Sequence, residues 1–208
     1  MRISKHLHSC LLIEDTDTTI LIDPGIFTYN EHALDIESLQ NLDYIIITHE
    51  HFDHMHIPLI QELIDKFPKA KILTNSSAAS LLEKENFNVL TQGDAIVSIQ
   101  DAPHEKLWDM EVPQNIVVNV FNKLTHPGDS LHFTTTNDIL CLPIQAPWGS
   151  TTAAVEKALE LKPKVIIPIH DWMWKDDVRT GMYGRLTQYF AKHEIRFEGL
   201  KTGQVVEL

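Results

Sequence analysis

A run of six residues, His49-Glu50-His51-Phe52-Asp53-His54, constrains this chain more than any other feature of its sequence. It follows the apolar stretch 44–48 (YIIIT), whose length and β-branched residues are typical of a buried strand. Alternate side chains of an extended backbone point the same way, so His49 and His51 can contact one ion. Asp53 and His54 are neighbours, and the chain has to bend before both reach a second ion. Imidazole and carboxylate ligands suit zinc, iron, manganese or nickel, so the run predicts a metal site rather than a solvated histidine-rich turn.

The length and composition favour one globular unit. With 208 residues, the chain can build one sizeable core, so we expect a single domain spanning 1–208. No apolar run reaches the length of a membrane span or of a signal peptide, so we expect a cytoplasmic protein with no membrane partner. Cys10 and Cys141 lie in apolar runs, and we interpret them as buried thiols, with a disulfide or a metal role as the alternative.

The formal net charge of −12 bears on partners. Two divalent cations would leave the surface acidic, which argues against a nucleic-acid backbone because phosphate binding requires clustered lysine and arginine. A small anionic substrate remains compatible, because a dinuclear centre supplies its own positive field. The oligomeric state cannot be predicted from the sequence.

The apolar periodicity predicts alternating strands and helices. The segments 36–49 and 155–170 share one design, an amphipathic stretch, a turn, an apolar strand and a histidine. This echo favours two similar β/α halves stacked sheet against sheet, with strand ends converging at one edge; chance similarity is the alternative. We expect strands at 10–13, 19–22, 44–48, 71–74, 95–100, 116–121, 131–134, 139–142, 165–169, 195–198 and 204–207, and helices at 58–67, 75–85, 152–161 and 177–192.

The run at 49–54 resembles the HxHxDH signature of the metallo-β-lactamase superfamily, and the resemblance covers nearly the whole chain. Residues 7–13 and 20–24 resemble that superfamily's opening hairpin. Residues 126–130 (HPGDS) resemble its later Gly-Asp turn, and 165–170 (VIIPIH) its last ligand strand. The resemblance implies an α/β fold of four layers, an αββα sandwich of mixed sheets with helices outside.

The resemblance also implies two divalent metal ions, with zinc expected and manganese or iron as alternatives. On residues alone, His104 would be an exposed loop histidine, and His-Pro-Gly-Asp would be a β-turn. In the family's pattern they become ligands, and Gly128 lets the backbone turn tightly beside the site. The implied ligands are His49, His51 and His104 for the first ion, Asp53, His54 and His170 for the second, and Asp129 bridging both.

Other residues are candidates for supporting roles. Asp23 ends a strand, where the superfamily uses an aspartate to orient a ligand histidine; a turn-forming Asp-Pro-Gly is the alternative. His8 and His126 are candidates for the pocket wall, with plain structural roles as the alternative. Four tryptophans follow strands or loops that should end near the site and could form a substrate-facing wall or pack in the core: Trp108, Trp148, Trp172 and Trp174.

These residues imply a metal-dependent hydrolase. A water shared by two divalent ions is deprotonated near neutral pH, and we expect this hydroxide to cleave an ester, lactone or related bond in a small molecule. Asp53 and Asp129 are the expected catalytic carboxylates. Residues 55–58 lack the glycines that follow the motif in other branches, which favours the compact ascorbate-phosphate-lactonase-like branch. The alternatives are a phosphodiesterase acting on a small phosphorylated compound and a non-catalytic metal-binding regulator.

Overall fold

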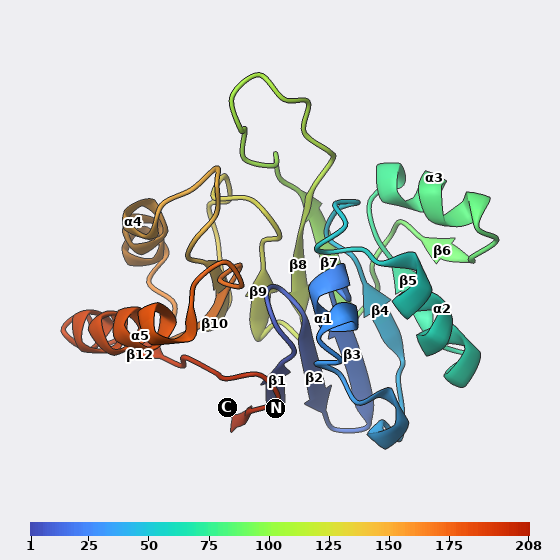
Figure 1. Ribbon diagram of the computed structural model, residues 1–208, viewed down its shortest axis with the longest axis horizontal. Helices are drawn as coiled ribbons and strands as arrows, with labels where there is room; N and C mark the ends of the chain where they lie inside the picture. The colour runs from blue at the N-terminus through green and yellow to red at the C-terminus, as the bar shows by residue number, and fades with distance from the viewer.

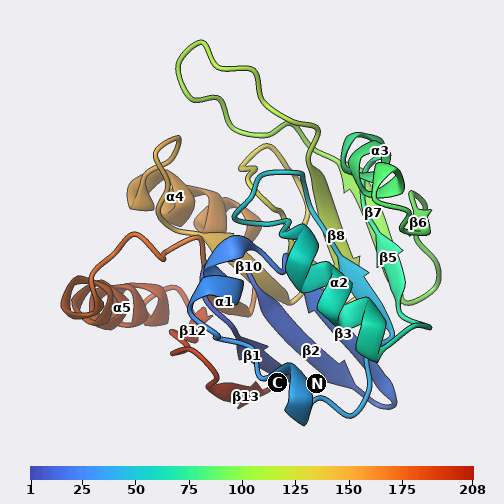
Figure 2. The same cartoon turned by 45° about the vertical axis from the view of Figure 1, so that its right-hand side comes forward.

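The computed structural model describes residues 1–208 and contains two stacked mixed sheets with helices on their outer faces (Figures 1 and 2). This is the four-layer αββα arrangement expected from the sequence. In the seven-stranded sheet, strands from β13 to β3 are antiparallel and strands from β3 to β6 are parallel. Its spatial order is β13 (Val205–Glu207), β1 (Arg2–Lys5), β2 (Leu11–Asp15), β3 (Thr18–Ile22), β4 (Tyr44–Ile46), β5 (Lys71–Leu73) and β6 (Val89–Leu90).

The six-stranded sheet has the complementary mixture, since strands from β12 to β9 are parallel and strands from β9 to β7 are antiparallel. Each sheet thus has a parallel and an antiparallel part. Its spatial order is β12 (Arg196–Phe197), β11 (Val165–Ile169), β10 (Ile139–Pro143), β9 (Leu124–His126), β8 (Ile116–Val120) and β7 (Val97–Asp101).

Alternation along the strands builds three hydrophobic layers. In β4 and the residue after it, Ile46 points between the sheets, while Ile45 and Ile47 point to the helices outside. Both faces of this strand are therefore buried, which explains its continuous apolar run. The outer layer on the seven-stranded sheet is covered by α2 (Ile57–Lys66) and α3 (Ser76–Lys84), and that on the six-stranded sheet by α4 (Thr151–Leu161) and α5 (Asp176–Ala191).

Five short elements are missing from the sequence prediction, and one predicted strand does not form. The predicted strand at 131–134 is wrong, because the Leu131 N–H donates to the Glu105 carboxylate and the His132 N–H to the Ser130 hydroxyl. These donors are then not free to pair with a strand. The elements that went unpredicted are β1, β6, β9, α1 (Ile26–Asn30) and the 3₁₀ helix η1 (Ile36–Ser38).

The amino-terminal strand β1 was missed because it carries charged residues. It pairs with β13, so the two ends of the chain lie together (Figure 1). Its last residue, Lys5, is buried, and its ammonium group donates to the Asp171 carboxylate at 2.6 Å and to the Pro168 carbonyl at 2.8 Å. The cysteines Cys10 and Cys141 are free and buried, as expected. No helix combines the length and the apolar composition needed to cross a bilayer.

Candidate metal centre

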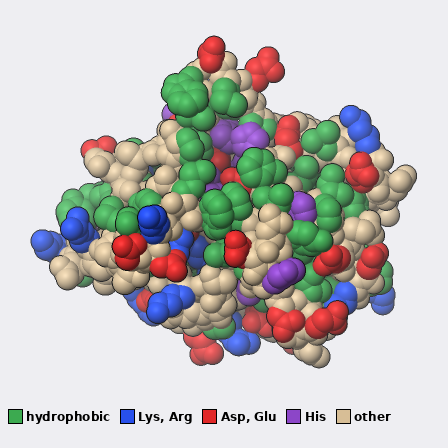
Figure 3. All heavy atoms as spheres, in the orientation of Figure 1, with side chains coloured by type: hydrophobic (Ala, Val, Ile, Leu, Met, Phe, Trp, Pro, Cys, Tyr) green, Lys and Arg blue, Asp and Glu red, His purple; other side chains and the backbone are tan.

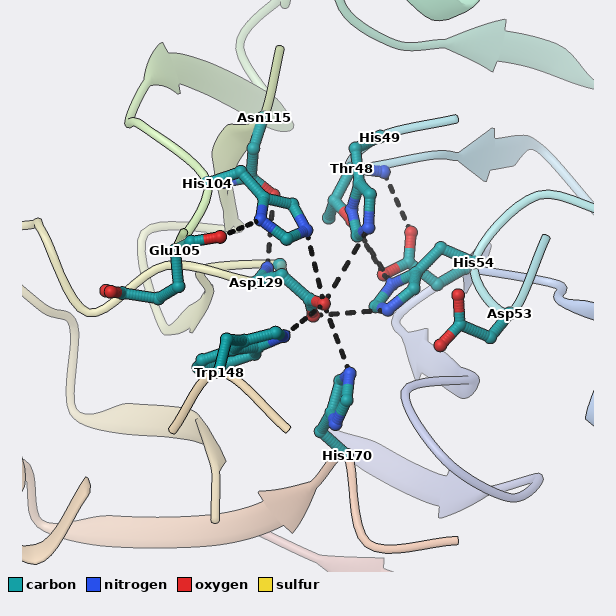
Figure 4. Close-up of polar contacts among 12 residues, drawn as sticks. Thr48, His49, Asp53, His54, His104, Glu105, Asn115, Asp129, Trp148 and His170 are labelled. Atoms are coloured by element: carbon teal, nitrogen blue, oxygen red, sulfur yellow. Dashed lines mark hydrogen bonds and ion pairs between the residues drawn. The ribbon is translucent and has the colours of Figure 1, made fainter. Parts of the chain in front are cut away.

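Eight donor side chains converge at the edge where strands of both sheets end (Figure 4). They form two groups, and within each group the ligand atoms all lie within 4.8 Å of one another. The three residues expected from the sequence for each ion lie together, with Asp129 in the first group and His8 in the second. The first group is His49, His51, His104 and Asp129; the second is His8, Asp53, His54 and His170.

Asp129 lies between the two groups. Its carboxylate oxygens are 3.1 Å from His54 Nε2 and 3.1 Å from His170 Nε2, which belong to the second group. They are 3.4 Å from His104 Nε2 and 3.8 Å from His49 Nε2, which belong to the first. One carboxylate thus faces histidines of both groups.

The turn after β4 is held by a buried carboxylate beneath it. Asp23, which directly follows β3, accepts hydrogen bonds from the Thr48 backbone N–H and hydroxyl, both at 2.8 Å. Its second oxygen also accepts the Nδ1–H of His54 at 2.7 Å. The Thr48 hydroxyl in turn accepts from His49 Nδ1 at 3.0 Å. Asp23 therefore fixes both ends of the motif, at the position expected for a residue that orients a ligand histidine.

Asn115, at the start of β8, holds the loops that carry His104 and Asp129. Its amide donates to the carbonyls of Ala102 and Pro127, at 3.2 and 3.0 Å, and its oxygen accepts the Asp129 N–H at 3.1 Å. Gly128 has φ +59°, and a Cβ there would lie 2.2 Å from the Asn115 oxygen. Only glycine fits this left-handed turn, as the sequence motif suggested.

The ligand histidines share one arrangement of their ring nitrogens. His104 Nδ1 donates to the Glu105 carbonyl at 2.6 Å, and His170 Nδ1 to the Gln145 carbonyl at 2.7 Å. With Nδ1 anchored to oxygen, as in His49 and His54, the Nε2 atoms point inward. Buried polar atoms normally have partners, yet the Nε2 atoms of His49, His54 and His104 have no hydrogen-bond partner. This arrangement fits a bound metal, whose ligand histidines keep the other ring nitrogen on an oxygen.

The charges of the site also favour a cation. Burial lowers the pKa of His49 well below its ordinary value and lowers that of His8 to about 4, so both rings are neutral, the form that binds metal. Burial opposes charge on Asp129, but His170 and His54 hold the pKa of this carboxyl well below its usual range. Against the effect of burial, Asp129 and Asp23 raise the pKa of His54. Positive charge is thus stabilised beside Asp129.

His8, a candidate for the pocket wall, lies among the donors of the second group. Its Nε2 is 3.1 Å from Asp53 Oδ2, its ring centroid is 4.0 Å from that of His170, and its carbonyl accepts the His170 N–H at 3.2 Å. His8, Asp23 and His170 have φ of +48°, +50° and +60°. Positive φ in residues with a Cβ is uncommon and concentrates at functional sites. No local sequence pattern marks these conformations.

His126 has the structural role that the sequence left open as the alternative to a place in the pocket wall. Its ring is fully buried, Nε2 donates to the Ser9 carbonyl at 3.2 Å, and Nδ1 accepts the Gly128 N–H at 3.2 Å. It supports the Gly-Asp turn from beneath instead. Its Nε2 is 4.0 Å from the Asp23 carboxylate.

The tryptophans divide between the site and its surroundings. Trp148 Nε1 donates to Asp129 Oδ2 at 3.1 Å, and its ring lies 5.2 Å from that of His170. Trp172 stacks on Phe27, a residue that the sequence did not single out. Trp174 packs against the core beneath α4 and α5, which is the alternative that the sequence left open for the tryptophans. Trp108 is 82% exposed on the loop between β7 and β8, which projects away from the body (Figure 1).

Fold and site together define a member of the β-lactamase superfamily. Residues 2–170 match the family model described as the beta-lactamase superfamily domain, and the chain belongs to this family. Protein Rv0786c of Mycobacterium tuberculosis is 30% identical over 201 residues, covering 90% of this chain and 92% of the relative. A protein of Exiguobacterium sp. named a UPF0173 metal-dependent hydrolase is 30% identical over 196 residues, covering 82% of this chain and 85% of its own.

The fold is also shared with solved structures. Igni18, described as a novel metallo hydrolase from the hyperthermophilic archaeon Ignicoccus hospitalis, superposes with a TM-score of 0.74 at 20% identity. The superposition covers 99% of this chain and 97% of Igni18. The enzyme class expected from the sequence, a metal-dependent hydrolase, is thus the class in which similar proteins are placed.

Proposed function

We propose that this chain is a hydrolase that binds two divalent metal ions and cleaves an ester, a lactone or a related bond in a small molecule. The observation that carries the proposal is the position of Asp129, whose carboxylate lies within 4 Å of histidines from both donor groups. Nitrogen donors combined with carboxylates are the ligands that zinc prefers, with manganese and iron as alternatives. The seven ligands proposed are His49, His51, Asp53, His54, His104, Asp129 and His170.

The proposed mechanism assigns a task to each carboxylate. When bound, the two ions supply a water-derived nucleophile at neutral pH and polarise the bond that is attacked. Asp53, whose side chain is 16% exposed, would orient this water and accept its proton. The His8 ring, in contact with Asp53 Oδ2, holds this carboxylate in place. Asp129 fixes the spacing between the two groups, and Trp148 holds Asp129 by its indole N–H.

One carboxylate and two backbone carbonyls orient the ligand histidines from outside. Asp23 keeps the His54 Nδ1 protonated by accepting its hydrogen bond, which leaves Nε2 free as a donor to metal. The carbonyls of Glu105 and Gln145 do the same for His104 and His170. The donors are therefore oriented before substrate arrives, which is how preorganised sites gain their catalytic effect.

Metal analysis and a substrate panel test this proposal. Protein reconstituted with zinc or manganese is expected to hold two ions per chain and to hydrolyse lactones and aryl esters. Asp129→Ala and His170→Ala are expected to abolish hydrolysis while the circular dichroism spectrum remains that of a folded chain. Full activity in both variants would defeat the two-metal mechanism. Two bound ions without turnover would favour a regulator, and preference for bis-p-nitrophenyl phosphate would favour a phosphodiesterase.

A further inference from the structure

Two aromatic rings are stacked beside the candidate metal centre. The rings of Phe27 and Trp172 lie with centroids 3.9 Å apart and planes inclined by only 4°. Both side chains are half-buried, so part of the stack is open to solvent. The Phe27 ring also meets the His8 ring edge-on at 5.2 Å. The stack therefore adjoins the second donor group directly.

The stack joins loops from the two sheets. Phe27 belongs to α1, which follows β3 of the seven-stranded sheet, and Trp172 belongs to the loop after β11 of the six-stranded sheet. Gly25 places α1 against the metal-binding turn, because a Cβ there would lie 1.8 Å from the Asp53 carbonyl oxygen. The rings are thus fixed relative to the donors on both sides.

Arg179 of α5 fixes the loop that carries Trp172. Its guanidinium donates to the carbonyls of Asp171, Trp172 and Trp174, at 3.1, 3.4 and 2.9 Å. Its Nε also lies 3.3 Å from the Asp171 carboxylate. An exposed loop whose carbonyls are held by one arginine loses little entropy when a ligand binds, so the stack is preorganised.

Further apolar side chains extend this surface. Phe52, within the metal-binding run, is 62% exposed, and its ring lies 6.1 Å from that of Phe27. Met173, next to Trp172, is 53% exposed. Exposed apolar groups gathered next to a polar site are typical of ligand-binding surfaces. On the face seen in Figure 3, hydrophobic side chains lie around the histidines that reach the surface.

We propose that Phe27, Trp172 and Phe52 form a platform for an apolar acyl or aryl group of the substrate, adjacent to the bond that is hydrolysed. The inference rests on the proposed function and narrows it to uncharged substrates with an apolar substituent. The two cation–π contacts of the molecule, Lys66 over Phe67 and Lys71 over Tyr44, involve none of these three rings. Apolar contact with the flat rings is the interaction that remains.

The size of the expected effect follows from the hydrophobic contribution of a methylene group. Full burial of a methylene contributes about 0.8 kcal/mol, roughly fourfold in affinity, and a half-open platform should give about twofold. Extending an acyl chain by four methylenes should then raise kcat/KM at least tenfold. The leaving group must stay constant so that the chemistry of the bond is unchanged.

The test compares 4-nitrophenyl acetate with 4-nitrophenyl hexanoate on metal-loaded protein. The ratio of their kcat/KM values is expected to exceed about ten in the wild type and to fall to about three or less in Trp172→Ala and Phe27→Leu. Tyr189→Ala, an exposed aromatic on α5, is the matched control and should keep the wild-type ratio. Metal content and melting temperature show whether each variant is folded. A wild-type ratio near one, or a ratio unchanged in both variants, would overturn the platform.

A binding measurement separates failure of the platform from failure of the proposed hydrolysis. Tryptophan fluorescence titrations of metal-loaded protein with two uncharged methyl ketones should give a dissociation constant for 2-heptanone at least tenfold below that for acetone, and the two values should converge in Trp172→Ala. If neither ester is cleaved but 2-heptanone binds selectively, the hydrolase proposal fails and the platform stands. Equal binding of both ketones by the wild type would overturn the platform whatever the turnover.

Arg179 is inferred to be a positioning residue that acts through Trp172. Arg179→Lys keeps the charge but cannot reach three carbonyls at once, because a lysine ammonium lacks the planar fork. It should lower the hexanoate-to-acetate ratio through a higher KM for hexanoate, at unchanged kcat. Arg185→Lys on the same helix is the control, since Arg185 is exposed and forms no ion pair. A fall in kcat with an unchanged ratio would show that Arg179 is merely structural.

Discussion

The two sheets contribute to the candidate metal centre in different ways. The seven-stranded sheet supplies most of its donors from one short turn, residues 49–54, and adds His8 from the loop after β1. The six-stranded sheet supplies three donors from three separate loops, namely His104, Asp129 and His170. The first set is held by side chains around the buried Asp23, and the second by backbone carbonyls and Asn115. One set is a local structure, whereas the other exists only when its sheet is assembled.

Metal binding should therefore stabilise the contact between the sheets. Each ion would take ligands from both, because His104 completes the first group and His170 the second. Direct protein contacts already cross this edge, among them the hydrogen bond from the His170 N–H to the His8 carbonyl and the approach of His54 Nε2 to the Asp129 carboxylate at 3.1 Å. Asp129 also remains buried among histidines.

Removal of metal is expected to have the largest effect on stability. A ligand present at one hundred times its dissociation constant stabilises the folded state by about 2.7 kcal/mol, so two ions should contribute about 5 kcal/mol. Chelation should lower the melting temperature measured by calorimetry, and added zinc should restore it. Asp129→Ala should show almost no response to zinc, because both groups lose the shared ligand. A wild-type melting temperature that changes with neither chelator nor zinc would contradict the proposal that bound metal stabilises the contact between the sheets.

Substitution of the two glycines that pack beside the metal centre should separate the two sets of donors. A Cβ on Gly25 would lie 1.8 Å from the Asp53 carbonyl oxygen, and one on Gly128 2.2 Å from the Asn115 oxygen. Overpacking costs typically 1–3 kcal/mol, and we expect about 3 kcal/mol for each alanine variant in urea unfolding. Gly25→Ala should disturb binding of the second ion, whose ligands include Asp53, and Gly128→Ala should disturb both ions through Asp129. Unfolding free energies close to wild type would show that these backbones adjust freely.

Exchanging aspartate and asparagine at Asp23 and Asn115, the residues that hold the two sets of donors, tests the difference between the sets with smaller changes. Asp23→Asn keeps the shape but cannot accept the hydrogen bonds of Thr48 and His54 with both oxygens. Loss of such a partner typically weakens metal binding 10–100-fold, and we expect that loss at the second ion in competition titrations. Asn115→Asp places a carboxylate against the carbonyls of Ala102 and Pro127, and should cost about 2 kcal/mol of stability. If both variants lowered stability and left metal affinity unchanged, Asp23 and Asn115 would not differ in the way proposed.

The difference between consecutive donors and donors from separate loops also explains which parts of the site could be predicted from the sequence. The run at 49–54 and the strand before it are recognisable because the donors are consecutive and the strand is buried on both faces. The strand at 165–169 was predicted with its observed bounds for the same reason. His104 and Asp129 could be proposed only from the order of family motifs, because each is a single residue in a loop. Their convergence depends on how the second sheet is assembled.

Other parts of the site depend on contacts between distant residues. The His8 ring reaches Asp53, 45 positions away, only because the backbone at His8 has a positive φ. Nothing in the sequence around Phe27 marks it as part of the site, because its partner in the stack, Trp172, comes from the other sheet. The predicted strand at 131–134 failed because side chains of Glu105 and Ser130 bind its backbone donors. None of these contacts follows from local periodicity.

The smallest expected effect is a gain in stability, and it comes from two glycines of α5, a helix that supplies no donor to the metal centre. Gly181 and Gly184 are exposed in the interior of α5, and a Cβ at either would have no atom within 4 Å. Glycine in a helix interior is less favourable than alanine by about 0.8–1.0 kcal/mol. Gly181→Ala and Gly184→Ala should therefore each raise the free energy of unfolding by up to about 1 kcal/mol, chiefly by restricting the unfolded chain. Metal affinity should stay at the wild-type value in both, because α5 supplies no donor. Stabilisation here together with destabilisation at Gly25 and Gly128 would show that the glycines of the metal centre are retained for space and backbone conformation. If all four substitutions instead changed stability alike, the tight packing would have no special bearing on the metal centre.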